Sequence, residues 1–419
     1  MEVKPGYKQT EVGVIPADWE ACPVSRKGEV VTGKALAATV PGQHRPYLRT
    51  KNVFDGRIDV EDVLTMPMTD QQFEHFRLKA GDVLLNEGQS LDLVGRCAIY
   101  SDEYPEPCAI QNQLLRFRAR TGVSPVFASY LFRYCQQRGV FANIALQTTS
   151  IAHLGASRFE QLCLAWPRTE VEQRAIAEAL SDVDALLGGL GRLISKKRDL
   201  KQAAMQQLLT GQTRLPGFEG EWGVKTLGEV FEISSSKRVF QSEWRSEGIP
   251  FYRARELAVL GQSGLVDNEL FISRTLYEKH RRAYGVPSVG DMLVTGVGTI
   301  GKVYVVSDDR EFYFKDGNII WFKIEAKMSA EFLRQLYLTN TVMKQVAEGG
   351  AGTTVGTYTI SAAKKTAIPF PTLGEQTAIA EVLTEMDAEI AALKQRREKT
   401  SALKQGMMQE LLTGKTRLI

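Results

Sequence analysis

The sequence predicts an α+β protein made of two related halves, each a β-rich unit with one long helix, the two helices pairing antiparallel. Three observations lead to this fold class: a strong internal repeat, helical apolar spacing inside the repeat, and short β-rich runs elsewhere. The 419 residues suffice for several domains with cores of their own. We therefore expect two twisted sheets, two long helices and a pseudo-twofold relation between the halves.

The internal repeat is strongest in two segments. EQRAIAEALSDVDALLGGL at 172–190 returns as EQTAIAEVLTEMDAEIAAL at 375–393. LKQAAMQQLLTGQTRL at 200–215 returns as LKQGMMQELLTGKTRL at 403–418. The chain therefore consists of one variable unit and one helical unit, written twice. The predicted segments are a first β-rich unit at 1–165, a central helical segment at 166–212, a second β-rich unit at 213–368 and a C-terminal helical segment at 369–419.

Both repeated segments have the apolar spacing of a coiled coil, with steps of three and four residues along one helix face. Pro167 and Pro371 stand where a helix can start, and Gly211 and Gly414 stand where it can end. Two near-identical seams in one chain predict mutual antiparallel pairing. The predicted seam residues are Ile176, Leu180, Val183, Leu187 and Leu190, and Ile379, Leu383, Met386, Ile390 and Leu393.

The remaining sequence predicts short strands separated by glycine and polar turns, with a few helices between them. Helices are expected at SPVFASYLFRYCQQRG (124–139) and at SAEFLRQLYLTNTVMKQVA (329–347). The predicted strands are Val83–Leu85, Ala98–Tyr100, Leu114–Phe117, Met292–Thr295, Val303–Val306 and Ile319–Ile324.

The stretch DMLVTGVGTIGKVYVV at 291–306 imitates a nucleotide site, because its glycines spell G-x-G-x-x-G and Lys302 completes G-x-x-x-x-G-K. A phosphate loop needs a helix directly after the glycines. Here a β-branched and aromatic run follows, which favours a strand. The matching stretch of the first half also lacks the glycine pattern. We therefore expect a structural hairpin that carries a basic residue.

Composition excludes several classes of protein. The five cysteines are scattered without a C-x-x-C pair, which suits reduced thiols in the cytoplasm, and the four histidines suggest no metal cluster. No apolar run approaches the ~18 residues of a membrane span, and no signal peptide is evident. The formal net charge of +3 means that any nucleic-acid surface is a local patch. No catalytic constellation is found, so we predict a non-enzymatic chain.

Basic, aromatic and hydroxyl residues in short segments are the candidates for binding DNA. We interpret PYLRTKNV (46–53) and PFYRAREL (250–257) as extended segments that present alternate residues on one face. Arg and Lys bind phosphates and guanine edges, Asn reads adenine, and Tyr can stack or bond a phosphate. For any single one of them, a merely solvated turn residue is the alternative. The candidates are Tyr47, Arg49, Lys51, Asn52, Arg96, Thr148, Thr149, Lys237, Arg238, Tyr252, Arg253, Arg255, Lys279, Arg281, Arg282, Lys302, Thr353 and Thr354.

The chain resembles the specificity subunit of type I restriction–modification systems over essentially its whole length. The resemblance rests on E-Q-x-A-I-A-E at 172–178 and 375–381, on L-L-T-G-x-T-R-L at 208–215 and 411–418, and on the G-D-x-L hairpins of both halves. The first copy departs from the pattern at AWPRTEVEQ, where a proline-rich lead-in like IPFPTLGEQ is usual.

This resemblance implies that each β-rich unit is a target-recognition domain, reading one half of a split, asymmetric double-stranded DNA sequence. The paired helices would set the gap between the halves and dock two methyltransferase subunits, and restriction/translocase subunits would join them. S-adenosylmethionine, ATP and Mg²⁺ would belong to the partners, with no cofactor on this chain. The alternatives are a non-catalytic DNA-binding scaffold and a coiled-coil interaction protein without a methyltransferase partner.

Overall fold

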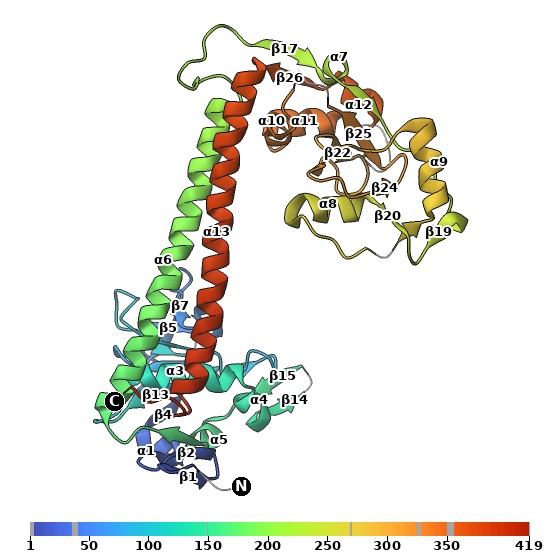
Figure 1. The fold of residues 1–419 in the computed structure, drawn as a ribbon. Helices are drawn as coiled ribbons and strands as arrows, with labels where there is room; N and C mark the ends of the chain where they lie inside the picture. The colour runs from blue at the N-terminus through green and yellow to red at the C-terminus, as the bar shows by residue number, and fades with distance from the viewer. Residues whose placement is uncertain are drawn as a thin grey trace. The chain divides into compact units, whose positions relative to one another are not determined.

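The computed structural model describes residues 4–35, 41–148, 150–268, 270–324, 328–349 and 356–418. The chain forms two compact units. Unit 1 comprises residues 1–191 and 396–419, and unit 2 comprises residues 192–395. Both units mix helices with β-sheets, and each contains part of the two long helices, α6 (Glu170–Leu208) and α13 (Leu373–Leu411) (Figure 1). The predicted α+β class with two long helices is confirmed.

Unit 1 contains short strands and helices ahead of α6. Its strands are β1 (Tyr7–Thr10), β2 (Gly13–Pro16), β3 (Glu20–Pro23), β4 (Gly28–Thr32), β5 (Gln43–Leu48), β6 (Val53–Phe54), β7 (Arg57–Ile58), β8 (Leu64–Met68), β9 (Val83–Asn86), β10 (Gly88–Gln89), β11 (Cys97–Ile99), β12 (Ala109–Ile110), β13 (Leu114–Ala119), β14 (Leu146–Thr148), β15 (Ile151–His153) and β16 (Cys163–Trp166). Its other helices are α1 (Val24–Lys27), the 3₁₀ helix η1 (Thr50–Asn52), α2 (Asp70–Phe76), α3 (Pro125–Gln137), α4 (Val140–Ile144) and α5 (Ala156–Gln161).

Unit 2 likewise has short strands and helices ahead of α13. Its strands are β17 (Gly223–Thr226), β18 (Glu232–Ser234), β19 (Trp244–Arg245), β20 (Ile249–Tyr252), β21 (Phe271–Ile272), β22 (Met292–Thr295), β23 (Val303–Val305), β24 (Tyr313–Phe314), β25 (Ile319–Lys323) and β26 (Ala367–Phe370). Its other helices are α7 (Leu227–Val230), the 3₁₀ helix η2 (Gln241–Glu243), α8 (Ala254–Ser263), α9 (Arg274–Tyr284), α10 (Ala330–Leu336), α11 (Asn340–Glu348) and α12 (Ile360–Lys365).

The main sheets of the two units have the same strand order. The antiparallel sheet β4-β13-β9-β11 of unit 1 corresponds to β18-β25-β22-β23 of unit 2. In each unit a parallel pair lies beside it, β12 with β5 and β24 with β20. A two-stranded ribbon, β3 with β16 or β17 with β26, leads directly into the long helix. The internal repeat of the sequence is therefore a repeat of topology.

The long helices pair antiparallel in both units, as predicted. In unit 1 the Lys404 ammonium binds the Asp184 carboxylate at 2.7 Å. In unit 2 Lys201 binds Asp387 at 2.6 Å and Lys197 binds Glu389 at 2.7 Å. The repeat aligns Lys201 with Lys404 and Asp184 with Asp387, so the two Lys–Asp pairs are the same interaction formed twice with the helices exchanged.

The seam residues also belong to the cores of the β-rich units. Ile176 and Leu180 pack in one cluster with Trp19 and Phe127. Every predicted seam residue is buried or half-buried. Each long helix therefore contributes apolar area both to the helix pair and to its own unit. Their partners in the cluster of unit 1 include Phe132, Trp166, Met408, Leu411 and Leu412, and those of Ile379 and Leu383 in unit 2 include Leu208, Leu209, Leu227, Phe322 and Phe332.

The glycine-rich stretch forms the predicted hairpin. β22 and β23 pair antiparallel, with Met292 opposite Val305. Gly298 and Gly301 have φ values of 77° and 76°, a conformation that favours glycine. The backbone N–H of Lys302 donates to the Thr295 hydroxyl at 3.0 Å. Because the strand β23 and not a helix follows the glycines, the phosphate-loop interpretation fails.

One predicted helix is wrong in detail. The segment 329–347 forms two helices, α10 and α11, with a break around Leu338. The break has a local cause, because the Thr339 side chain accepts the backbone N–H of Val342 and caps the start of α11. Apolar spacing continues across the break and therefore hides it.

All five cysteines are free thiols, as predicted, and four of them are buried. Burial raises the pKa of the Cys135 thiol to about 12. No helix in the described part of the chain is long and apolar enough to cross a membrane.

Candidate nucleic-acid interface

One exposed tyrosine of unit 2, Tyr284, lies at the end of α9, a helix that carries several basic residues. Lys279, Arg281 and Arg282 are exposed on the same helix. Lys237 comes from the loop after β18, and its ammonium lies 4.9 Å from the centroid of the Tyr284 ring, within cation–π distance. The structure thus joins two segments that the sequence proposed separately into one basic surface.

A buried histidine lies beneath this surface. His280 is 8% exposed and stacks on Tyr313 with ring centroids 5.0 Å apart. The Tyr313 hydroxyl accepts the backbone N–H of Lys237 at 2.9 Å, which fixes the loop above the stack. Neither ring nitrogen of His280 has a hydrogen-bond partner among the described residues. Burial lowers the pKa of His280, so the imidazole is neutral at neutral pH and the surface charge comes from Lys and Arg.

The cations of α9 differ in how far acidic neighbours already neutralise them. Arg281 lies 3.5 Å from Glu278 and 3.9 Å from Glu311, counted between charged atoms. Lys279 and Arg282 form no ion pair with any residue that the structure describes. These two side chains are therefore the most available for a phosphate.

The other predicted basic residues of unit 2 lie on different elements. Arg238 is exposed and binds Asp316 at 3.2 Å. Arg255 is exposed on α8, and Lys302 is exposed in the turn between β22 and β23. α8 packs closely against β23, because a Cβ on Gly261 would lie 2.2 Å from the Val303 carbonyl oxygen.

The expectation that PYLRTKNV and PFYRAREL are extended throughout is wrong. The strands end at Leu48 and Tyr252, and helical turns follow. The cause is a capping interaction, because the backbone N–H of Arg49 donates to the Asn52 side chain at 3.0 Å and that of Arg253 donates to Glu256 at 2.9 Å. Alternation therefore does not place these basic residues on one face.

Burial also changes the candidate set. Tyr47 is 8% exposed and belongs to an apolar core. Asn52 is 2% exposed, and its amide donates to two backbone carbonyl groups. Tyr252 is half-buried and packs against the Phe312 ring, with centroids 5.2 Å apart. We therefore remove Tyr47 and Asn52 from the candidate surface, since their polar atoms serve the fold.

Arg49 and Lys51 of unit 1 converge on one carboxylate. Their side-chain nitrogens lie 2.8 and 2.6 Å from Asp62. The hydrogen bond from Lys51 holds the pKa of the Asp62 carboxyl below its ordinary value. Lys51 is the more exposed of the two cations, with 66% of its side chain accessible.

Arg96 shares an aromatic ring with a second arginine that the sequence analysis missed. Its guanidinium lies 4.9 Å from the centroid of the Phe54 ring, and that of Arg57 lies 4.7 Å from the same centroid. Arg96 also donates to the Val53 carbonyl at 3.1 Å. The aromatic residue inside the basic stretch KNVFDGR was the available signal.

One of the predicted hydroxyl residues, Thr148, lies within the described residues. Thr148 is exposed at the end of β14, which forms a hairpin with β15. Thr149, Thr353 and Thr354 lie outside the described residues. No group of three or more His, Cys, Asp or Glu side chains within the described ranges could hold a metal ion.

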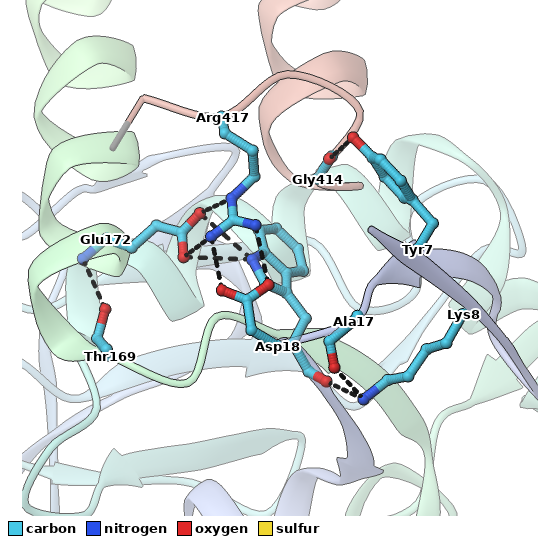
Figure 2. A network of polar contacts seen from close by, with 9 residues as sticks. Tyr7, Lys8, Ala17, Asp18, Thr169, Glu172, Gly414 and Arg417 are labelled. Carbon is cyan, nitrogen blue, oxygen red and sulfur yellow. Dashed lines mark hydrogen bonds and ion pairs between the residues drawn. The ribbon is translucent and has the colours of Figure 1, made fainter. Parts of the chain in front are cut away.

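An ion-pair cluster around the buried Glu172 carboxylate holds the end of α13 in unit 1; we call it the Arg417 cluster (Figure 2). The Arg417 guanidinium binds the Glu172 carboxylate at the start of α6 and both oxygens of Asp18 at 2.9 Å. The Trp19 indole N–H donates to Glu172 at 3.3 Å. Nearby, the Tyr7 hydroxyl donates to the Gly414 carbonyl at 3.1 Å.

Unit 2 contains the equivalent Arg214 cluster. The Arg214 guanidinium binds the fully buried Glu375 carboxylate, with one contact of 2.7 Å. The Trp222 indole N–H donates to the same carboxylate at 3.0 Å. Backbone carbonyls of Glu219 and Gly220 take the remaining guanidinium donors. The repeated motif T-R-L therefore has a physical role, since its arginine ties the end of one long helix to the start of the other.

A doubled α+β framework, a doubled helix pair and exposed basic residues in each half define a class of internally repeated proteins. Residues 219–401 match the type I restriction modification DNA specificity domain. The chain is also 23% identical to the type I restriction enzyme MjaVIII specificity subunit of Methanocaldococcus jannaschii, covering 96% of this chain and 94% of the relative. Over almost its whole length, the chain is therefore similar to type I restriction enzyme specificity subunits.

Two solved structures share the fold. The S subunit of the type I restriction-modification system from M. genitalium superposes with a TM-score of 0.56, at 16% identity and 98% coverage of both chains. A chain from a study of complex assembly and conformational transition in the type I R-M system gives a TM-score of 0.58, at 16% identity, covering 96% of this chain and 99% of that chain.

Proposed function

We propose that this chain is the DNA-reading, non-catalytic subunit of a cytoplasmic type I restriction–modification complex. Each unit reads one half of a split double-stranded DNA sequence. One observation carries the proposal: the two units share strand order, helix pairing and ion-pair cluster, yet their exposed basic residues differ in position and partners. A common framework with different surfaces suits two half-sites of different sequence.

In unit 2, the candidate DNA contacts are on the basic surface around Tyr284. In unit 1, they are Arg57 and Arg96, whose guanidinium groups lie over the Phe54 ring. Exposed Lys and Arg can bind phosphates or guanine edges, and neighbouring aromatic residues can stack or bond a phosphate. Lys279, Arg282 and Arg255 therefore supply binding in unit 2, and Lys51 and Arg57 supply it in unit 1. Base contacts come from loops at the edges of these surfaces.

The long helices serve as spacer and dock. Each has 39 residues, which corresponds to about 58 Å at 1.5 Å per residue. The repeated Lys–Asp pairs give the two ends of the helix pair related surfaces, which suits two copies of one methyltransferase subunit. Restriction/translocase subunits join this core, and S-adenosylmethionine, ATP and Mg²⁺ are held by the partners.

The test is single-molecule sequencing of genomic DNA from cells with and without this gene, scoring N6-methyladenine. We expect a split, asymmetric motif that disappears with the gene. Loss of the gene without any change in methylation contradicts the proposal. Unchanged methylation would favour a scaffold or a coiled-coil interaction protein without a methyltransferase partner. Copurification with a methyltransferase would distinguish these alternatives from the proposed subunit.

A spacer variant sharpens this test. Insertion of four residues into one long helix adds about 6 Å and should change the gap between half-sites by one or two base pairs of ~3.4 Å. Arg255→Ala serves as the matched surface variant, and we expect it to affect only the half-site read by unit 2. An unchanged gap in the insertion variant contradicts the spacer role.

A further inference from the structure

A cavity of about 660 Å³, with both polar and apolar lining residues, lies in unit 2, between the paired helices and the segment that joins α10 to α11. α6 lines it with Arg198 and Lys201, and α13 lines it with Asp387 and Lys394. Its volume is in the roughly 300–1,000 Å³ range of pockets that enclose a ligand. None of these residues belongs to the surface of unit 2 that we propose to contact DNA.

The charges of the cavity are unbalanced. Lys201 and Asp387 neutralise each other, with 2.6 Å between the ammonium and the carboxylate. Arg198 and Lys394 are exposed and form no ion pair or hydrogen bond with any residue in the described part of the chain. One unpaired cation from each long helix therefore lines the same cavity.

The repeat shows that these two cations are not part of the common framework. The Lys201–Asp387 pair has its equivalent in unit 1, formed by Lys404 and Asp184. The equivalents of Arg198 and Lys394 are Ser401 and Gly191, which carry no charge. Lys415 replaces Gln212 in unit 1, but neither helix supplies a cation at the positions of Arg198 and Lys394.

We propose that this cavity binds an acidic segment of a partner protein, so that the two ends of the helix pair bind partner copies unequally. The inference rests on the proposed function and deepens it. Carboxylates form charge-assisted hydrogen bonds with Arg and Lys, and desolvation in a cavity strengthens them. The side-chain amides of Gln202 and Gln206, which also line the cavity, can bond the backbone of such a segment.

The experiment uses the full chain coexpressed with its methyltransferase subunit, with stoichiometry and affinity measured by native mass spectrometry across a salt series. In the variant Arg198→Gln with Lys394→Gln, we expect one methyltransferase copy to bind roughly tenfold more weakly, with a shallower salt dependence. Lys196→Gln with Lys399→Gln is the matched control, because it removes two exposed cations of the same helices outside the cavity.

The outcomes separate the possibilities. Loss of one copy in the cavity variant, with both copies retained in the control, supports the proposal. Equal weakening of both copies, or no change, overturns it. Weaker DNA binding by the cavity variant in the absence of methyltransferase also overturns it, because the cavity then binds phosphate. If the unaltered chain binds no methyltransferase, the proposed function fails first and the inference fails with it.

Discussion

The Arg417 and Arg214 clusters share an arginine and a tryptophan bound to one glutamate, but the chain connects their parts differently. Arg214 lies six positions from Gly220, whose carbonyl it binds. Arg417 lies 399 positions from Asp18, and only noncovalent contacts join them. A short covalent loop keeps its ends at high local concentration, whereas distant segments must be brought together at a larger entropic cost. The same cluster should therefore respond differently to the same substitution in the two units.

The largest expected effect comes from removing the buried carboxylates. Glu375→Ala should destabilise unit 2 by about 3 kcal/mol, because it leaves Arg214 with backbone carbonyls only and Trp222 without an acceptor. Glu172→Ala should cost less, because Arg417 keeps its ion pair with Asp18. Differential scanning calorimetry measures both losses.

Exposed glutamates of the same helices provide the control for this prediction. Glu178 and its repeat equivalent Glu381 are exposed and form no ion pair in the described ranges. Their alanine variants should change stability by less than ~0.5 kcal/mol. An equal loss in Glu172→Ala and Glu375→Ala would show that the additional Asp18 pair contributes nothing.

The fold was predictable because its strongest signals are local and repeated. The seam from Ile176 to Leu190 predicts a helix without knowledge of its partner, and the copy at 375–393 predicts that partner. The break between α10 and α11 was not predicted, because it depends on one capping side chain, Thr339, inside a continuous apolar pattern. Capping by Asn52 and Glu256 likewise ended two expected strands early.

The second-largest expected effect is a difference between the two clusters in local opening, measured by hydrogen–deuterium exchange. Arg417→Ala should raise hydrogen–deuterium exchange at both ends of unit 1, in peptides covering the first 20 described residues and residues after Leu411. We expect roughly 30-fold faster exchange, equivalent to about 2 kcal/mol of lost charged hydrogen bonds. Arg214→Ala should open residues 213–226 by about 1 kcal/mol, because the short loop keeps Trp222 near Glu375. An equal increase in exchange in the two variants would show that the short covalent loop of unit 2 does not make its cluster more resistant to opening.

The candidate interface was less predictable than the fold, because exposure depends on elements far apart in the sequence. Tyr47 lies in an extended segment as expected, yet other strands cover it. Tyr284 became a candidate only when the structure placed Lys237 over its ring. Residue type indicated which side chains could bind DNA, and packing decided which of them remain accessible.

The smallest expected effect is the acid sensitivity of the Arg417 cluster. The hydrogen bond from Arg417 lowers the pKa of the Asp18 carboxyl below its ordinary value of ~3.9. A carboxyl with a lowered folded-state pKa stabilises the fold while it is ionised, so its contribution is complete above the ordinary pKa and is lost as pH falls through the folded-state pKa. Asp18 is 59% exposed, so the contribution should stay below ~1 kcal/mol.

Asp18→Asn isolates this contribution from the other carboxylates that titrate in acid. We expect the difference in unfolding free energy between the unaltered chain and Asp18→Asn, measured by urea titration, to be constant from pH 7 to about 5 and to shrink below pH 4. Asp316→Asn, which removes the surface partner of Arg238 in unit 2, controls for the loss of an exposed ion pair. A difference that grows on acidification would reverse the sign of the linkage and show that protonated Asp18 is the form that the cluster stabilises.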